Sequence, residues 1–361
     1  MPSSALFLRS SSQFGGIERQ LLWHARRLHY DGWSVHVAAL YRRPGEHPLV
    51  QAARSTGLAA TTITDPAPWS LRPRRVLHAL LHRLQPRILH TTDYRSDALA
   101  AWMRERPGWV AETQGHTNES LRMQLWNWLD VRALRRADAV APVSAAWETW
   151  LAARGVPAAR LTTLGNSRAI LLPPPHPASL QLPGPGPHLL YAGRLSPEKG
   201  VDLLLDAWPA VRHRWPDARL WVLGRWGGSR RYRHRVETGL QQRGVLYLGH
   251  QPDIRAWLQA TDVVIVPSRR EAWGMTAFEA LCAGTPLAAA RIGGLPEVCR
   301  GAEHVRLFVA DDAADLVRAL DATLEADFPR GPELGRAYCS QPRFDPQRRH
   351  QILLTIYAGM I

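Results

Sequence analysis

The sequence contains little cysteine and almost no lysine. Its 361 residues include three cysteines, Cys282, Cys299 and Cys339. This odd and scattered set fits neither a disulfide framework nor a zinc site, so we expect reduced and mostly buried thiols. Of the 45 basic residues, all except Lys199 are arginine. A chain that uses arginine almost everywhere makes its single lysine a position of interest.

Long hydrophobic runs are also missing. No apolar stretch approaches the roughly 20 residues that a membrane-spanning helix needs. The first residues, 1–9, lack the basic and then apolar arrangement of a signal peptide, and we therefore expect a cytoplasmic protein. At 45% hydrophobic and 21% charged residues, the composition is that of an ordinary globular protein. The length exceeds what one hydrophobic core usually supports, which predicts two domains.

Acidic residues are too few to balance the basic ones, and the formal net charge is +14. Such a charge predicts an anionic partner: nucleic acid, an anionic membrane face or a phosphorylated substrate. No nucleic-acid-binding motif accompanies the charge. We therefore expect no nucleic acid among the partners.

Strands and helices alternate through both halves of the chain, which predicts two consecutive doubly wound α/β domains with parallel sheets. Between them, residues 172–187 are too dense in proline for a helix or a central strand, which predicts a linker. The expected layout is an N-terminal domain over 1–171, a second domain over 188–344, and a C-terminal helix over 345–361 that either stands alone or packs back on the first domain. Such sheets bind ligands at the carboxyl ends of their strands.

One candidate site follows the predicted strand 263–266. Glu271 and Glu279 bracket Gly274 and the start of a helix, where backbone N–H groups attract a phosphate. The two carboxylates can accept hydrogen bonds from sugar and ribose hydroxyls. An alternative is purely structural: Thr276 and Glu279 have the spacing of a capping box that stabilises the helix start.

A second candidate site follows the first strand of the second domain. Arg194 and Lys199 lie in a loop bounded by Gly193 and Gly200, where two cations can clamp a diphosphate. The alternative is a solvated basic loop. Because lysine occurs only here, the composition favours a specific role for Lys199.

These motifs and others together resemble the GT4-type glycosyltransferases of the GT-B fold, in which two Rossmann-like domains face each other across a cleft. The resemblance is densest from 189 to 298 and covers most of the chain. The matching segments are 191–200, 248–250, 267–280, 283–286 and 293–297 in the second half, and 14–18, 134–144 and 165–167 in the first.

The resemblance implies roles for individual residues. Arg194 and Lys199 would hold the diphosphate of a nucleotide-sugar donor. Glu271 would contact the sugar, and Glu279 the ribose. Backbone donors to sugar and phosphate would come from Gly274, Met275 and Thr276, and the glycine-rich first loop with Gly15 and Gly16 would approach the donor phosphate and the acceptor.

The sequence departs from the family at one position. After the strand 110–112 the family commonly has a histidine, where this chain has Gln114. His116 lies two residues further on and is our candidate to replace it. The alternative is that His116 is an ordinary polar loop residue.

The implied reaction is a retaining, metal-independent glycosyl transfer with no cofactor, from a nucleotide-diphosphate sugar to a hydroxyl acceptor. A cell-envelope glycan or a lipid-linked saccharide is the expected acceptor. Arginine interleaved with Trp and Leu over 122–136 also suggests attachment to the inner, anionic face of the cytoplasmic membrane, against the alternative of a helix packed in the core. The rival functions are a sugar-nucleotide epimerase and a non-enzymatic basic module that binds membrane or nucleic acid.

Overall fold

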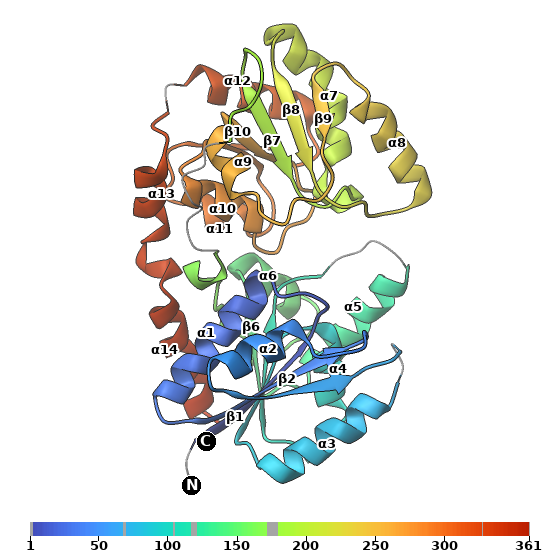
Figure 1. Ribbon diagram of the computed structural model, residues 1–361, viewed down its shortest axis with the longest axis vertical. Coiled ribbons are helices and arrows are strands. Elements are labelled where there is room, and N and C mark those ends of the chain that lie inside the picture. The colour runs from blue at the N-terminus through green and yellow to red at the C-terminus, as the bar shows by residue number, and fades with distance from the viewer. Residues whose placement is uncertain are drawn as a thin grey trace. The chain divides into compact units, whose positions relative to one another are not determined.

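The chain forms two compact units in the computed structural model (Figure 1). The first contains residues 1–115, 125–172 and 342–361, and the second contains 116–124 and 173–341. The structure describes residues 3–67, 70–103, 105–116, 121–171, 180–326 and 328–360. The first part of the expected linker, 172–179, lies outside the described residues.

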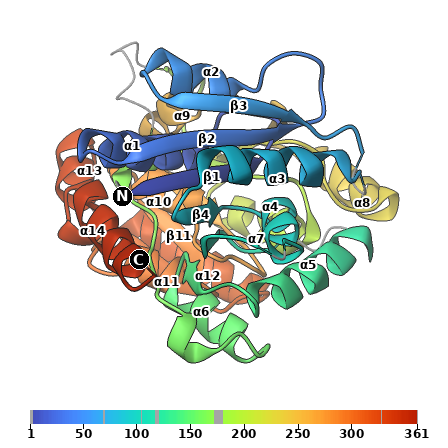
Figure 2. The same cartoon turned by 90° about the horizontal axis from the view of Figure 1, so that it is seen from below.

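The first unit is built on a six-stranded parallel sheet with the order β3-β2-β1-β4-β5-β6. Its strands are β1 (Ser4–Ser10), β2 (Ser34–Tyr41), β3 (Ala59–Thr64), β4 (Ile88–Thr91), β5 (Gly108–Thr113) and β6 (Ala139–Pro142). Its helices are α1 (Gly16–Tyr30), α2 (Pro48–Ser55), α3 (Arg72–Leu84), α4 (Tyr94–Ala101), α5 (Leu121–Leu134), α6 (Ala145–Ala152) and α14 (Pro346–Ala358), with short 3-10 turns at Ala158–Arg160, Arg168–Ile170 and Pro342–Phe344. The first turn of α5, up to residue 124, is grouped with the second unit. Helices α1 and α14 lie on one side of this sheet and α3 to α5 on the other (Figures 1 and 2).

The second unit repeats the architecture with the strand order β12-β11-β10-β7-β8-β9, again all parallel. Its strands are β7 (His188–Ala192), β8 (Arg219–Leu223), β9 (Val245–Tyr247), β10 (Val263–Val266), β11 (Leu287–Ala290) and β12 (Val305–Phe308). Its helices are α7 (Val201–Arg214), α8 (Arg230–Leu240), α9 (Arg255–Ala260), α10 (Met275–Ala283), α11 (Leu295–Cys299), α12 (Ala313–Glu325) and α13 (Pro332–Cys339), with a 3-10 turn at Pro197–Lys199.

Both sheets reverse their winding direction at one pair of neighbouring strands. In the first unit the pair is β1 and β4, and in the second it is β7 and β10. The loops that leave such strands diverge to opposite sides of the sheet and open a crevice at the carboxyl ends, which is where ligands bind in doubly wound folds. The topology therefore selects the loops after β7 and β10 as a binding position.

The C-terminal helix α14 is part of the first unit's core. Leu353 and Tyr357 are completely buried in the same hydrophobic cluster as Phe7 and Leu28. The Tyr357 hydroxyl lies 3.1 Å from His24 Nε2 and 2.6 Å from the ring nitrogen Nδ1 of His90. Helix α14, at the end of the chain, is thus part of the hydrophobic core of the N-terminal domain.

A buried ion pair adds a polar anchor to this helix. Arg349 of α14 contacts the Glu112 carboxylate at 2.5 Å, and His90 Nε2 lies 3.3 Å from the same oxygen. Burial alone would raise the pKa of Glu112, but Arg349 and His90 outweigh it and lower that pKa to about 2. Glu112 therefore stays ionised in the core.

The predicted fold class is confirmed: two doubly wound, Rossmann-like parallel sheets with interleaved helices. Ten of the twelve described strands were predicted from the sequence, and β3 and β12 were not. Both lie at a sheet edge, and the sequence of β3, AATTIT, contains a single large apolar residue. Among the described residues, no helix is both long and apolar enough to cross a bilayer.

Candidate active site

Two loops meet at the carboxyl ends of β7 and β10. The carbonyl of Glu198 accepts hydrogen bonds from the backbone N–H groups of Arg269 at 2.8 Å and Arg270 at 3.2 Å. Gly200 has a φ of +68°, and a Cβ there would lie 1.9 Å from the Pro267 carbonyl oxygen. Glycine is therefore required for the loop 193–200 to approach the loop 267–274 so closely.

Lys199 and Glu271, two of the residues that the sequence singled out for chemistry, form an ion pair between these loops. Lys199 Nζ lies 2.5 Å from Glu271 Oε2, and the Ser268 hydroxyl lies 3.3 Å from the same oxygen. The side chains are 24% and 13% exposed, so both are reachable from solvent yet partly desolvated. A cation and a carboxylate are thus held side by side where the topology predicts a ligand.

Arg194, the second expected cation, is in the same loop. Its guanidinium donates to Glu198 at 2.6 Å, and the Tyr191 hydroxyl donates to the Arg194 carbonyl at 2.6 Å. The Arg194 side chain is 38% exposed. The loop between β7 and α7 therefore carries both predicted cations, each in contact with a glutamate.

A pair that sequence reasoning missed braces the two loops. Arg269 donates two hydrogen bonds to Asp202, at 2.8 and 3.0 Å, and a third to the Pro197 carbonyl at 2.8 Å. Burial would raise the pKa of Asp202, but the Arg269 guanidinium lowers it below its usual value. A forked, charge-assisted contact of this kind fixes geometry as well as adding energy. It holds the loop with Lys199 against the loop with Glu271.

The start of α10 tests the capping-box alternative for Thr276 and Glu279. The helix cap is Gly274, with φ +110°, and Thr276 is the second helical residue. The Thr276 hydroxyl donates to the Ala192 carbonyl at 2.9 Å, at the end of β7. The capping-box alternative is therefore wrong, because Thr276 does not occupy the cap and its side chain is bonded to a strand instead.

The first turn of α10 contains the residues that we expect to offer backbone donors to a phosphate. Its first residues are Met275 and Thr276, and the first N–H groups of any helix have no acceptor within that helix. At Gly274 a Cβ would lie 2.6 Å from the Leu295 side chain in a backbone conformation that other residues rarely adopt. Glu279 lies further along α10 and is half-buried.

Two consecutive glycines support the Glu271 loop from β11. A Cβ at Gly293 would lie 1.8 Å from the Glu271 carbonyl oxygen, and the Gly294 N–H donates to that oxygen at 3.0 Å. A Cβ at Gly294 would lie 2.4 Å from the Ala272 carbonyl. The sequence marked these glycines as a motif without a role. The structure shows that they set the position of Glu271.

The loop after β8 is a further part of the site that sequence reasoning missed. The backbone N–H of Leu195 donates to the Arg225 carbonyl at 2.8 Å, and Gly227 donates to the Leu195 carbonyl at 3.1 Å. Trp226, the residue between them, packs edge-on against Tyr247 with ring centroids 5.5 Å apart. Its neighbouring glycines were the signal available in the sequence.

Gly15 and Gly16 lie in the first unit, at the carboxyl end of β1. Gly15 is the cap of α1, and its N–H donates to the Glu18 carboxylate at 2.8 Å. The other Glu18 oxygen accepts from Arg9 at 2.8 Å. Although burial opposes ionisation, Arg9 lowers the pKa of Glu18. Asp93 accepts from the Ser10 N–H at 2.6 Å, so a charged framework shapes this glycine loop.

The loop after β5 contains Gln114, which stands at the family's histidine position, and His116, our candidate to replace that histidine. Gln114 donates through its amide to Glu112 at 2.6 Å, so its side chain is committed to the buried ion pair. His116 follows and is half-buried. Residues 117–120 lie outside the described residues. The role of His116 remains a prediction.

Comparisons with known proteins agree with this architecture. Residues 186–326 match the model of the family "Glycosyl transferases group 1", and residues 15–167 match the "Glycosyl transferase 4-like domain". A D-inositol 3-phosphate glycosyltransferase of Pseudarthrobacter chlorophenolicus is 35% identical over 156 residues, which are 42% of this chain and 37% of that protein. The aligned part is thus well under half the length of that curated relative.

Two solved structures have the same fold over nearly the whole chain. HepE of Anabaena, in complex with UDP-glucose, superposes with a TM-score of 0.76 at 19% identity and 99% coverage of both chains. WaaG, a glycosyltransferase involved in lipopolysaccharide biosynthesis, gives a TM-score of 0.67 at 15% identity, with 97% of this chain and 99% of that chain covered. With both family domains matched in order, this chain belongs to the GT4-type glycosyltransferases of the GT-B fold.

Proposed function

We propose that the protein transfers a sugar from a nucleotide-diphosphate sugar to a hydroxyl acceptor, with retention of configuration and without a metal ion. The observation that carries the proposal is the Lys199–Glu271 pair at the carboxyl ends of β7 and β10. It combines a cation for a leaving diphosphate with a carboxylate for the sugar. The start of α10 adds backbone donors beside them.

The proposed chemistry depends on where charge develops. When the bond between the anomeric carbon and the diphosphate breaks, negative charge grows on the phosphate oxygens and positive charge on the sugar ring. Lys199 and Arg194 would stabilise the first, and Glu271 the second. Groups that are already oriented towards developing charge lower the barrier most. In this scheme side-chain cations take the part that a divalent metal plays elsewhere.

The lysine suits this position because of its geometry. An ammonium group has three N–H donors, so a hydrogen bond to Glu271 is compatible with another to a phosphate oxygen. The ribose would be held by Glu279, and the acceptor side would be formed by the glycine loop at Gly15 and Gly16 together with His116. HepE, whose structure contains UDP-glucose, supports a nucleotide-sugar donor.

We further propose a cell-envelope glycan or lipid-linked saccharide as acceptor, and loose attachment to an anionic membrane face through the first unit. The formal charge of +14 and the lipopolysaccharide context of WaaG support both. No cofactor is part of the proposal.

The test is nucleotide release from a panel of nucleotide sugars, with and without acceptor. The binding donor is first selected as the one that raises the melting temperature. Acceptor-dependent release of the nucleoside diphosphate supports a transferase. A changed sugar that stays attached to its nucleotide would establish an epimerase instead. No binding of any nucleotide sugar would leave a non-enzymatic role and refute the proposal.

A further inference from the structure

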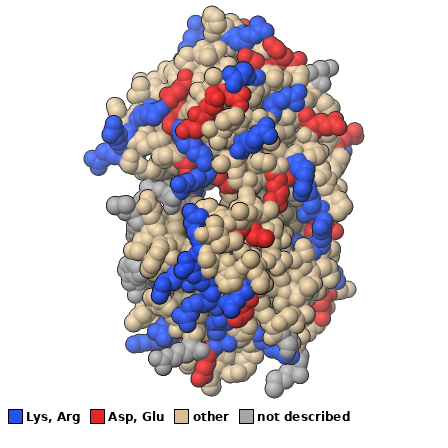
Figure 3. Space-filling model, turned by 180° about the vertical axis from the view of Figure 1, so that it is seen from behind, with Lys and Arg blue, Asp and Glu red and all other residues tan. Residues whose placement is uncertain are grey.

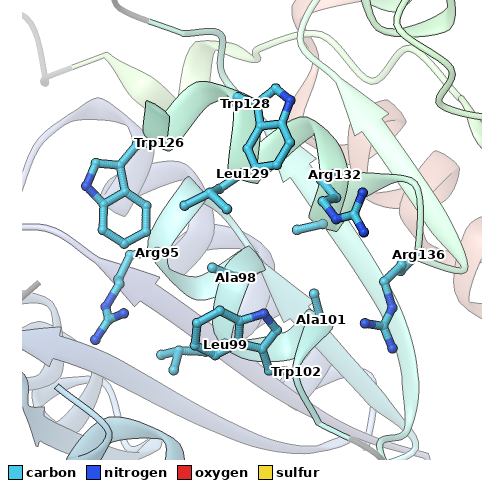
Figure 4. Close-up of a pocket in the computed structure, with 11 residues that line it drawn as sticks. Arg95, Ala98, Leu99, Ala101, Trp102, Trp126, Trp128, Leu129, Arg132 and Arg136 are labelled. Atoms are coloured by element: carbon cyan, nitrogen blue, oxygen red, sulfur yellow. The ribbon is translucent and has the colours of Figure 1, made fainter. Parts of the chain in front are cut away.

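The first unit has an apolar groove away from the sheet ends, between helices α4 and α5. Its volume is about 300 Å³. Small and buried side chains, Ala98, Ala101 and Ala133, form its floor. Trp128 and Trp102 flank it, and the guanidinium groups of Arg132 and Arg136 stand at one end (Figure 4). The groove is thus apolar along its length and cationic at one end.

The rim of this groove is unusually apolar for a protein surface. Trp128 and Trp102, which line the groove, are 60% and 47% exposed. Leu125, one turn before the lining residue Leu129 on α5, is 47% exposed. Among the described residues, Trp102 and Trp128 are the tryptophans that are exposed, and both line this groove. Such clustering marks an interaction surface.

The exposed charge around the groove is mostly positive. Exposed arginines on and after α3 and α5 are Arg72, Arg74, Arg75, Arg83, Arg132, Arg135 and Arg136. The described carboxylates on α3, α4 and α5 are Asp97 and Asp130, and both are buried. Beyond the helix ends, Glu105 and Asp138 are exposed, and Asp138 pairs with Arg106. Burial, together with the Asp130 carboxylate, raises the pKa of Asp97 well above its usual value. Basic side chains also predominate over acidic ones on the part of the first unit seen in Figure 3.

The neighbouring charges on the groove walls are not equivalent. Arg95 also lines the groove, but it is buried and paired with Asp65 through two hydrogen bonds at 3.0 and 3.1 Å. Arg132 is exposed, and its guanidinium lies 6.0 Å from the Trp128 ring. Arg132 and Arg136 are therefore the cations that can meet a ligand from solvent.

We propose that this groove holds one acyl chain of an anionic phospholipid, with the lipid phosphate against Arg132 and Arg136 and with Trp128 and Trp102 in the interfacial layer of the bilayer. Guanidinium groups bind phosphate through paired N–H donors. Tryptophan prefers the boundary between headgroups and acyl chains. The exposed arginines around the groove outnumber the two exposed carboxylates, Glu105 and Asp138, which matches an anionic surface better than a protein partner of mixed charge. This site rests on the proposed membrane attachment and is independent of glycosyl transfer.

Flotation with vesicles tests the charge requirement. The full chain is mixed with phosphatidylcholine vesicles, with or without phosphatidylglycerol, at low and high salt and without donor or acceptor. We expect it to float with the anionic vesicles at low salt. Each arginine near an anionic surface contributes about a five-fold gain in partitioning, so the variant R132Q/R136Q should partition about 25-fold less. The matched control R230Q/R231Q changes the same charge on the exposed start of α8 and should float like the wild type.

Brominated lipids test whether the groove itself is occupied. Bromine on the acyl chain quenches tryptophan fluorescence only at contact, and the difference between the wild type and Trp128→Phe isolates the Trp128 signal. We expect that difference to be large with anionic vesicles and to shrink in Ala98→Leu, which narrows the groove. Tyr30→Ser is the control for an exposed aromatic side chain, since Tyr30 is 81% exposed on α1.

Three outcomes would overturn the proposal: equal flotation of R132Q/R136Q and R230Q/R231Q, flotation without quenching of Trp128, or quenching that does not change when Ala98 is enlarged. A concentration-dependent dimer that is lost in Trp128→Ser and is indifferent to vesicles would assign the surface to a second copy of the chain. If Ala98→Leu fails to fold, Ala101→Leu serves the same purpose. Nucleotide binding measured in solution should be unchanged in all these variants, so failure here is distinguishable from failure of the proposed glycosyl transfer.

Discussion

The replacement of Lys199 by methionine is the sharpest test of the proposed site. Methionine keeps an unbranched apolar stem and removes the charge that lies 2.5 Å from Glu271. Because the side chains are 24% and 13% exposed, loss of the pair should cost about 1–3 kcal/mol of unfolding free energy, the range for a polar group left without its partner. We therefore expect Lys199→Met to fold and to melt within a few degrees of the wild type.

The effect on turnover should be larger than the effect on stability. If Lys199 stabilises charge on the leaving diphosphate, its removal raises the barrier by roughly 2.7–4 kcal/mol, which is about a 10²- to 10³-fold loss in kcat, by analogy with the loss of one oxyanion donor. The nucleoside diphosphate should also bind more weakly to the variant, whereas the nucleoside alone should not. The assay is kcat and KM by nucleotide release, with calorimetry for binding.

Two companion variants separate a catalytic role from a structural one. If Lys199 merely neutralises Glu271, then adding Glu271→Gln to Lys199→Met removes the stranded carboxylate and should restore activity. If both act on the donor, the double variant stays as slow as the slower single variant. Arg231→Met, at an exposed position of α8, is the control for loss of one positive charge. Near-normal turnover in Lys199→Met would refute the reasoning.

Three further predictions follow from the remaining contacts. Glu271→Gln should lower kcat more than nucleotide affinity, whereas Glu279→Gln should lower nucleotide affinity in calorimetry; unchanged affinity in the latter would remove Glu279 from the donor site. Activity should survive excess EDTA, and a complete loss that magnesium or manganese restores would contradict metal independence. Arg349→Met should cost about 3–5 kcal/mol of unfolding free energy in urea titration because it strands a buried carboxylate, whereas the exposed Arg348→Met should cost under about 0.5 kcal/mol. The folded-state pKa of Glu112 is about 2, against an ordinary 4.5. Ionised Glu112 therefore stabilises the fold above pH 4.5, and this contribution to the free energy of unfolding is lost as the pH falls towards 2. If the wild type and Arg349→Met lost stability equally as the pH falls, the Glu112–Arg349 pair would not be its source.

The sequence predicted those parts of the fold that local patterns determine. A run such as Val263–Val266 signals a buried strand on its own, and the loop after it was correctly expected to begin a helix. The parallel winding then follows from the alternation of strands and helices. Strand β3 was not predicted because its Ala and Thr residues give little hydrophobic pattern. Only Ala60 and Ile63 of this edge strand are buried, so the strand needs little apolar surface.

Contacts between distant residues could not be predicted in the same way. Arg269 and Asp202 are 67 positions apart, and nothing in either neighbourhood marks one as the partner of the other. The ion pair of Arg349 with Glu112 joins α14 to β5 across most of the chain. The spacing of Thr276 and Glu279 even suggested a wrong local structure, because a capping box is defined by backbone position, which the pattern alone does not reveal.

The single lysine gains its meaning only from the contacts around it. Elsewhere this chain meets carboxylates with arginine, as in the forked contact of Arg269 with Asp202 that ties the two loops together. An arginine at position 199 would bind both oxygens of the Glu271 carboxylate in the same way and hold that side chain fixed. An ammonium group contacts one oxygen and keeps a compact, rotatable set of donors for a phosphate. We therefore expect Lys199→Arg to keep the charge and the fold yet to lose much of the turnover. The requirement at position 199 would then be the geometry of the ammonium group rather than its charge alone.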